Sequence, residues 1–217
     1  MADPTSRAGT TYVSQEIIAW TNRVHASHDP SLQAAFDTPA MTGIPAIMVG
    51  ESEGKLLSML VAMIRAKKVV EIGTLAGYSA IQLARGVGLG GRVWSIENDP
   101  KHAELARENV RTAGLGAIIT VEVGAGLEVL PRLQAHGPFD AVFIDADKAN
   151  YDEYGRWAAA NVRPGGLLLG DNAFLFGKLL EDSPTAAAMR RFHEEARAAF
   201  ETVCIPTPDG LLLGVRR

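Results

Sequence analysis

The run Phe139-Asp140-Ala141-Val142-Phe143-Ile144-Asp145-Ala146-Asp147-Lys148 decides the fold of this chain. Its apolar middle predicts a buried strand, and that strand ends in two acids and a lysine. In an open α/β sheet, ligands bind just beyond the carboxyl ends of the strands. Acidic oxygens at that place can hold a hard cation, and a lysine three residues after the first acid can act as a base. For this run taken alone, a solvated loop of mixed charge is the alternative interpretation.

A second apolar run, Gly165-Gly166-Leu167-Leu168-Leu169-Gly170, ends in Asp171 and Asn172, which also carry oxygen ligands of the kind that metals bind. Neighbouring parallel strands deliver their carboxyl ends to the same edge of a sheet. Two such strands with polar ends therefore indicate one site at one edge.

Working outward from these two runs, short β-rich segments alternate with helical patterns along the chain. The predicted strands cover 69–72, 91–97, 118–122, 139–144, part of 164–170, 202–205 and 211–215. The predicted helices between them cover 78–85, 100–113, 127–135, 151–161 and 185–199. The connection at 206–210 is too short for a parallel crossover, so the last two strands should form an antiparallel hairpin. The fold class is therefore α/β: a Rossmann-like, doubly wound, seven-stranded and mostly parallel sheet with an antiparallel last strand.

Helical patterns at 14–28 and 51–66 flank a segment with Pro39, Gly43 and Pro45, which we expect to be a loop. We predict that 1–66 forms a helical N-terminal lid on the Rossmann-like core, 67–217. The whole chain is then a single domain, as its 217 residues permit.

Composition excludes several classes of partner. The net charge of −4 argues against nucleic acid, whose binding depends on neutralising phosphates. No apolar run approaches the length of a membrane span, and residues 1–9 lack the apolar core of a signal peptide. The single cysteine, Cys204, permits no internal disulfide, so we expect a cytoplasmic protein without a membrane partner.

The first predicted strand leads into Glu71-Ile72-Gly73-Thr74-Leu75-Ala76-Gly77-Tyr78-Ser79. Its glycine spacing differs from the G-x-G-x-x-G of dinucleotide binders, and many such turns carry glycines for geometry alone. The second strand ends in Glu97, which suits the ribose diol of either NAD or S-adenosylmethionine. Glu71 favours the second cofactor, because a carboxylate there would repel a pyrophosphate but suits an ammonium and a sulfonium.

Taken together, the runs 70–79, 143–148 and 171–172 resemble the cation-dependent O-methyltransferases of the caffeoyl-CoA and catechol type. The resemblance includes Met48 with Val49, Glu53 with Gly54, and the late 209–211 run, so it extends from about Pro45 to the C-terminus. Within the family the chain looks closest to small bacterial catechol O-methyltransferases, which implies a homodimer. Apolar residues of the N-terminal region fit such a contact: Ile17, Ile18, Trp20, Leu32 and Phe36.

The resemblance implies a role for each matching position. The residues implied to bind S-adenosylmethionine are Val49, Glu71, Gly73, Thr74, Ser79, Glu97, Ala125, Gly126 and Asp145. Asp145, Asp171 and Asn172 are implied to hold Mg²⁺ or another hard divalent cation, and Lys148, with Asp145 and Asn172, to be catalytic. Gly126 stands where the family commonly has a larger residue. The segment 173–177 lacks the family's Leu-Trp pair, and it borders the acceptor pocket.

The chemistry gives these residue types a purpose. A phenol with a pKa of about 10 is only about one part in a thousand ionised at pH 7. A divalent cation on both hydroxyls of a catechol favours the phenoxide, and three oxygen ligands leave octahedral positions for the acceptor. The predicted function is magnesium-dependent methyl transfer from S-adenosylmethionine to a catechol or phenolic small molecule.

Three alternatives stay open: a caffeoyl-CoA-like acceptor, an NAD-dependent dehydrogenase, and a binding protein that kept the cofactor pocket. The region before Pro45 offers only Arg7 and Arg23 as full cations for the phosphates of CoA. Trp20 and Phe36 are expected in the core, whereas Phe174 and Phe176 either pack there or stack on a planar acceptor. The histidines lack metal-ligand spacing, and we expect His25 and His28 to be solvated.

Overall fold

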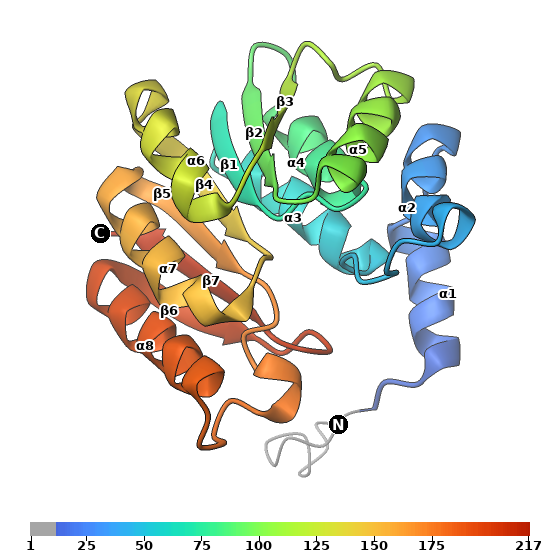
Figure 1. Ribbon diagram of the computed structural model, residues 1–217. Helices are drawn as coiled ribbons and strands as arrows, with labels where there is room; N and C mark the ends of the chain where they lie inside the picture. The colour runs from blue at the N-terminus through green and yellow to red at the C-terminus, as the bar shows by residue number, and fades with distance from the viewer. Residues whose placement is uncertain (1–11) are drawn as a thin grey trace.

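The computed structural model describes residues 12–217 and contains one twisted sheet with helices on both faces (Figure 1). The strand order is β3-β2-β1-β4-β5-β7-β6. The strands are β1 Lys68–Ile72, β2 Arg92–Glu97, β3 Ile119–Val123, β4 Phe139–Ile144, β5 Val162–Gly170, β6 Phe200–Ile205 and β7 Leu211–Arg216. All neighbouring pairs from β3 to β5 are parallel, and β7 runs antiparallel to both β5 and β6. The predicted fold class, including the final antiparallel hairpin, is confirmed.

The direction of chain winding reverses between β1 and β4, which lie side by side. From β1 the chain moves outward to β2 and β3, and it then crosses back to place β4 and β5 on the other side. Such a reversal opens a crevice at the carboxyl ends of the two central strands, where ligands bind in this class of sheet. The two runs that predicted the site, the glycine turn after β1 and the acids after β4, meet there.

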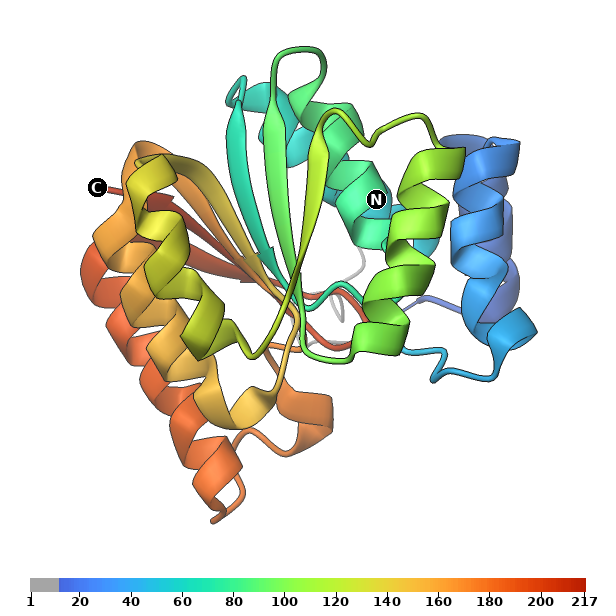
Figure 2. The same ribbon diagram turned by 45° about the horizontal axis from the view of Figure 1, so that its top comes forward.

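The helices divide between the two faces of the sheet (Figure 2). The face that carries α3, α4 and α5 is packed by one apolar cluster, and the face that carries α6, α7 and α8 by another. These helices are α3 Glu51–Met63, α4 Tyr78–Val87, α5 Pro100–Thr112, α6 Gly126–Leu133, α7 Tyr151–Asn161 and α8 Pro184–Ala199. Because both faces are covered, the central strands read as continuous apolar runs rather than as alternating ones.

Local capping chemistry starts the long helices where the sequence indicates. Asp99 accepts from the backbone N–H of Lys101 ahead of α5, and Ser183 accepts from that of Ala186 ahead of α8. A proline follows each cap, where its missing N–H costs nothing because the first turn of a helix has no intrahelical acceptor.

One prediction for the N-terminal region is wrong. The segment expected to be a loop around Pro39 is largely a helix, α2 Pro30–Thr42, which lies between α1 Gln15–His25 and α3. Asp29 caps it by accepting from two backbone N–H groups, and Pro30 opens it. Pro39 is tolerated inside the helix because it is buried with Leu32 against the fold, and the loop begins only at Gly43.

The expected burial of aromatic residues is half right. Phe36 packs against the core as predicted, whereas the Trp20 side chain on α1 is 56% exposed. Leu32 is buried within the fold, so it is not part of an exposed N-terminal surface. None of the helices in residues 12–217 is long and apolar enough to cross a membrane.

Candidate active site

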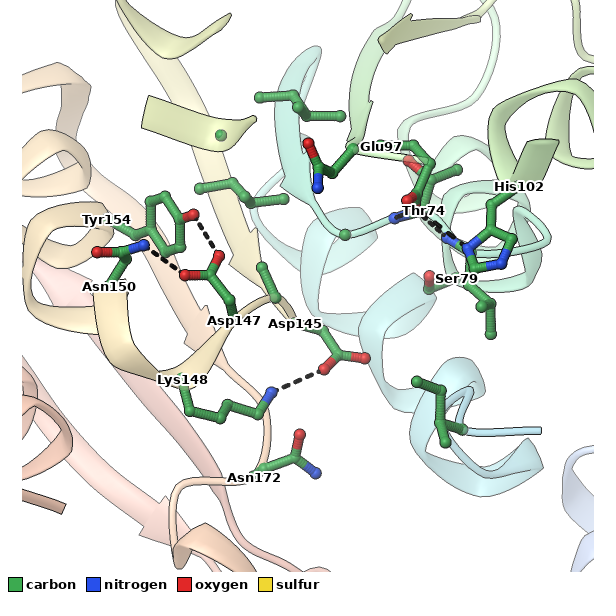
Figure 3. A pocket seen from close by; sticks show the side chains of 18 of the residues that line it. Thr74, Ser79, Glu97, His102, Asp145, Asp147, Lys148, Asn150, Tyr154 and Asn172 are labelled. Carbon is green, nitrogen blue, oxygen red and sulfur yellow. Dashed lines mark hydrogen bonds and ion pairs between the residues drawn. The ribbon is translucent and has the colours of Figure 1, made fainter. Parts of the chain in front are cut away.

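A cavity of about 780 Å³ opens at the carboxyl ends of β1, β2 and β4 and reaches the segment after β5 (Figure 3). Its floor depends on Gly73, whose φ is +97° and whose missing side chain leaves room for the neighbouring strand end. A Cβ at this position would lie 1.8 Å from the backbone oxygen of Asp145. Only glycine allows the turn after β1 and the acid after β4 to approach this closely.

Most of the predicted site residues line this cavity. Those on its wall are Gly73, Thr74, Ser79, Glu97, Ala125, Gly126, Asp145, Lys148 and Asn172. The remaining three, Val49, Glu71 and Asp171, are buried and do not line it. The structure therefore gathers most of the predicted site residues on the wall of one cavity. The other three are buried and do not reach the cavity surface.

Glu97, at the end of β2, is held by backbone donors. One carboxylate oxygen accepts from the N–H groups of Thr74 and Leu75, at 3.2 and 2.8 Å, and the other accepts from that of Asp99 at 2.9 Å. Three hydrogen bonds fix the carboxylate in one orientation on the cavity wall. His102, which sequence reasoning did not select, also lines the cavity, with Nδ1 3.8 Å from Glu97 Oε1. The glutamate can thus present its free lone pairs to hydroxyl groups.

Glu71 lies in the middle of the sheet and is completely buried. Its Oε2 accepts a hydrogen bond from Ser95, whereas Oε1 makes none to the described residues. Burial raises the pKa of Glu71 to about 8, and the Ser79 and Ser95 hydroxyls offset only part of this rise. Because Ser79 itself lines the cavity, a cationic group bound there would have this buried carboxylate behind it.

Lys148 projects from the short helix η3 Lys148–Asn150 toward the end of β4 (Figure 3). Its Nζ donates to Asp145 Oδ1 at 3.0 Å and to the hydroxyl of Tyr151 at 2.7 Å. The completely buried Tyr151 hydroxyl lies 3.1 Å from the Ile144 carbonyl and 3.0 Å from that of Asp171, which leaves it few other orientations. Sequence reasoning missed Tyr151, although a tyrosine three residues after a lysine is a usable signal for a contact within a helical turn.

Negative charge accumulates around Asp171. Burial, together with the charges of Asp145 and Glu53, raises the pKa of this carboxyl to about 8. Desolvation by burial also raises the pKa of Glu53. Lys148 is the cation that opposes this trend. A divalent cation bound by Asp145 and Asp171 would fit this place, because its charge would offset the repulsion between the ionised carboxylates.

The side chains of the described residues do not form a complete metal site by themselves. In the part of the chain that the structure describes, no three histidine, cysteine or carboxylate side chains converge to hold a metal ion. The predicted ligands are two carboxylates and the amide of Asn172, which has a left-handed backbone at φ +52°. A cation in such a set needs ligands beyond the protein, and an acceptor or water can supply them.

Apolar side chains form the mouth of the cavity. Ile47, in the loop before α3, is 72% exposed, and Phe176, in the segment after β5, is 64% exposed. Both line the cavity, together with Lys148 and Asn172. Of the two phenylalanines expected either to pack or to stack on an acceptor, Phe176 is at the mouth, whereas Phe174 is half-buried against the turn at Gly210.

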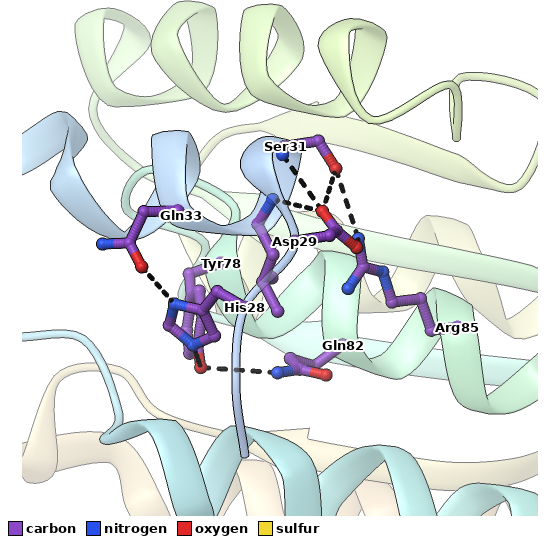
Figure 4. A network of polar contacts seen from close by, with 8 residues as sticks. His28, Asp29, Ser31, Gln33, Tyr78, Gln82 and Arg85 are labelled. Atoms are coloured by element: carbon purple, nitrogen blue, oxygen red, sulfur yellow. Dashed lines mark hydrogen bonds and ion pairs between the residues drawn. The ribbon is translucent and has the colours of Figure 1, made fainter. Parts of the chain in front are cut away.

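His28 is not the solvated residue that the sequence suggested. It is half-buried, and its ring nitrogens lie 3.1 Å from Gln33 Oε1 and 2.9 Å from the hydroxyl of Tyr78 (Figure 4). Tyr78 lines the cavity at the start of α4 and also forms ring contacts with His28 and Phe36. This network connects the N-terminal helices to the cavity wall, and a histidine pattern alone does not reveal it.

The unusual glycine at position 126 has a packing reason. A Cβ there would lie 2.8 Å from the ring of Tyr154 and 2.9 Å from its hydroxyl. Tyr154 donates to Asp147 Oδ1 at 2.6 Å, and both residues line the cavity (Figure 3). The tyrosine thus occupies the space that a larger residue at position 126 would require.

The strand order, the antiparallel β7 and a cavity with an acid at the end of β2 define a Rossmann-like protein with a pocket for an adenosine-containing cofactor. A family model described as O-methyltransferase matches residues 25–217, and the chain belongs to this family. The catechol O-methyltransferase of Niastella koreensis is 43% identical over 199 residues, covering 86% of this chain and 90% of the relative. Caffeoyl-CoA O-methyltransferase 2 of Zea mays is 35% identical and covers 74% of this chain and 67% of the relative.

Solved structures agree with this assignment. The O-methyltransferase from Bacillus cereus, solved in complex with SAH, superposes with a TM-score of 0.89 at 34% identity, covering 93% of this chain and 97% of that one. The protein is therefore an S-adenosylmethionine-dependent O-methyltransferase. This membership excludes the NAD-dependent dehydrogenase that the sequence had left open.

Proposed function

We propose that the protein transfers a methyl group from S-adenosylmethionine to one hydroxyl of a catechol, with magnesium as the cation. The observation that carries the proposal is the position of Lys148. Its Nζ lies 3.0 Å from Asp145 on a cavity wall shared with Asn172, below an apolar mouth. The Niastella koreensis relative, named a catechol O-methyltransferase, supports the choice of acceptor.

The residues at the β1 and β2 end of the cavity bind the cofactor. Glu97 accepts hydrogen bonds from the ribose hydroxyls, while its backbone donors hold it in place. Gly73, Thr74 and Ser79 take the methionine end, and Glu71 opposes its ammonium from behind the wall. Ala125 and Gly126 border the adenine, and Val49 supports the wall from its buried position.

The residues at the β4 and β5 end act on the acceptor. Asp145, Asp171 and Asn172 would hold the cation, and its charge would favour the ionised form of the acceptor hydroxyl. Lys148 would accept the proton from the reacting hydroxyl as a neutral amine, the form that the charge of a dication bound beside it favours, and the hydroxyl of Tyr151 holds the amine in place at 2.7 Å. Ile47 and Phe176 line the same cavity and would help to exclude water from a planar acceptor. S-adenosylmethionine, when bound, would supply the methyl group to the phenoxide, and its sulfur would leave as a thioether.

A caffeoyl-CoA acceptor is the second candidate, favoured by the relative from Zea mays. Incubation with labelled S-adenosylmethionine, magnesium and a panel of catechols and CoA esters decides between the two. Transfer to catechols, dependent on magnesium, is the expected result. Transfer to CoA esters alone would replace the proposed acceptor, and no transfer to either class would contradict the proposal.

We further propose that residues 12–66, the described part of the predicted lid 1–66, act as a helical lid on the core of residues 67–217, within one domain; residues 1–11 lie outside the described residues. The loop with Ile47 belongs to this region, and the His28–Tyr78 contact connects it to the cavity wall. Proteolytic removal of the N-terminal helices should abolish acceptor binding. We retain a cytoplasmic location as a prediction that rests on the single cysteine.

The remaining proposal is a homodimer formed through α1. This helix lies at the outer edge of the molecule (Figure 1) and exposes Ile17, Trp20 and Val24 by 50%, 56% and 52%. Their spacing of three and four residues places them on one face of the helix. Light scattering should give twice the chain mass at micromolar concentration and the monomer mass for Trp20→Glu.

A further inference from the structure

The segment that follows β5 adopts a backbone that side chains rarely tolerate. Asn172, Leu175 and Phe176 have φ values of +52°, +51° and +54°, although none of them is a glycine. Residues in this left-handed region are unfavourable and persist only where their surroundings hold them. The segment also carries Phe176 to the mouth of the cavity, so whatever holds its backbone controls the acceptor wall.

The turn between β6 and β7 holds this segment from the side (Figure 1). The backbone N–H of Ala173 donates to the Gly210 carbonyl and that of Phe174 to the Asp209 carbonyl, each at 2.9 Å. A Cβ at Gly210 would lie 2.8 Å from the Phe174 ring, so the turn and the segment are in close contact. These bonds use main-chain acceptors that any sequence in the turn could supply.

One bond in this contact depends on a particular side chain. The carboxylate of Asp209 accepts from the backbone N–H of Phe176, with Oδ1 at 2.8 Å. Its other oxygen, Oδ2, is buried and makes no hydrogen bond to the described residues. Within residues 12–217, the Phe176 amide is therefore the one hydrogen-bond donor to this carboxylate. Phe176 is also one of the residues whose backbone is left-handed.

We propose that Asp209 is a positioning residue that fixes Phe176 against the acceptor and so determines which of two catechol hydroxyls is methylated. This inference rests on the proposed catechol methylation. In the proposed function Lys148 and Asn172 hold the reacting hydroxyl, and Phe176 lines the same cavity as these two residues. A substituent on the catechol ring must point either toward Phe176 or away from it. These two orientations present different hydroxyls to Lys148, so the position of the Phe176 ring selects between them.

The test compares Asp209→Ala with Asp209→Asn, which keeps an oxygen at the Oδ1 position. The acceptor is a catechol with one substituent at ring position 4, and both methylated products are quantified. Loss of a hydrogen bond to a charged group corresponds to an effect of about tenfold. We expect Asp209→Ala to raise the KM for the catechol about tenfold and to bring the two products toward equal amounts. Asp209→Asn should stay within about threefold of the wild type in both respects, and neither variant should change the Kd for S-adenosylmethionine.

Hydrogen exchange at the Phe176 amide provides a readout that does not need turnover. Exchange should be faster in Asp209→Ala and close to wild type in Asp209→Asn, because only the first loses the acceptor. Unchanged exchange and product ratio in Asp209→Ala would overturn the inference, as would equal impairment of both variants. Weaker cofactor binding in parallel with catechol KM would also overturn it, because the defect would then be general. A wild type that methylates no catechol would instead refute the proposed function, and amide exchange would still decide whether Asp209 holds Phe176.

Discussion

The two halves of the cavity treat buried acids differently. At the ends of β1 and β2, Glu97 accepts hydrogen bonds from three backbone N–H groups, which satisfy both of its oxygens. At the ends of β4 and β5, the carboxyl of Asp171 is buried near Asp145 and Glu53, with Lys148 as the opposing cation. Backbone donors of the protein satisfy Glu97 in the first half, whereas the acids around Asp171 in the second half repel one another when they are ionised.

This difference indicates which half of the cavity needs a bound ligand to balance the charge of its acids. A carboxylate that is satisfied by fixed donors keeps its orientation whether or not a ligand is present. Acids that repel one another in a buried place favour a bound cation, because it restores the balance of charge. If this comparison is right, disturbing the second half should affect metal binding and chemistry, and disturbing the first half should affect cofactor binding.

The largest expected effect comes from removing the cation. Thorough chelation with EDTA should abolish methyl transfer to a catechol, and magnesium should restore it. Asp171→Ala should also abolish transfer, because the cation loses a carboxylate ligand. Magnesium should raise the thermal midpoint of the wild type and not that of Asp171→Ala, since a bound ligand stabilises the folded state.

The control for this prediction is Asp182→Ala, which removes an exposed acid outside the cavity. It should retain both activity and the magnesium-dependent rise in thermal midpoint. Full activity after chelation would show that the acids around Asp171 do not bind a cation needed for methyl transfer. The contrast between the two halves would then have no role in catalysis.

The next effect in size concerns the base. Lys148→Ala should lower kcat by about a hundredfold or more, as loss of a general base typically does. The affinity for S-adenosylmethionine should stay the same, because Glu97 and its donors are not disturbed. Steady-state kinetics and calorimetry on the same preparation check both statements. Lys101→Ala, an exposed lysine on α5, serves as the matched control, and a kcat near wild type in Lys148→Ala would remove the lysine from the mechanism.

A smaller effect is expected in the first half of the cavity. Glu97→Ala should weaken S-adenosylmethionine binding about tenfold or more, because charge-assisted hydrogen bonds contribute about 1.5–3 kcal/mol. The magnesium-dependent rise in thermal midpoint should survive, since the second half is intact. Glu104→Ala, which removes an exposed acid of α5, is the control. Unchanged cofactor affinity by calorimetry in Glu97→Ala would contradict the assignment of the ribose to this residue.

The smallest effect concerns Glu71, the acid of the first half that lacks backbone donors. Its folded-state pKa of about 8 lies above the ordinary 4.5, so the folded protein holds this proton more tightly than the unfolded chain. The stability that this provides is complete below about pH 4.5 and is lost as the pH rises toward 8, by up to about 1.4 kcal/mol per pH unit.

Glu71→Gln is neutral at every pH and should remove this slope. In thermal melts of the cofactor-free protein between about pH 5.5 and pH 8, its midpoint should fall less than that of the wild type. Glu201→Gln, which changes an acid 81% exposed on β6, should keep the wild-type slope. If the thermal midpoints of the wild type and Glu71→Gln change with pH in parallel, Glu71 is already ionised in the folded protein. The first half of the cavity would then contain a buried charged acid, as the second half does.

The sequence determined the sheet and the position of the site. Five apolar runs of strand length, each followed by a helical pattern, and a final pair of runs joined by a short turn predicted all seven strands, because burial of strands leaves a clear local signal. The acids after β4 and β5 and the glycine turn after β1 indicated one edge of the sheet, since parallel strands end together. Capping residues such as Asp99 and Ser183 fixed helix starts for the same local reason.

Only the tertiary structure decided how the side chains at that edge are paired. The chain does not reveal that His28 reaches Tyr78, 50 residues away, because this contact depends on how a whole helix packs. It also misled at Pro39, where burial against the fold keeps the helix intact despite a residue that ordinarily ends one. The contact between Asp209 and the Phe176 amide joins positions 33 residues apart. Local sequence patterns report backbone conformation and burial, whereas the relative placement of distant segments follows from packing of the complete sheet and its helices.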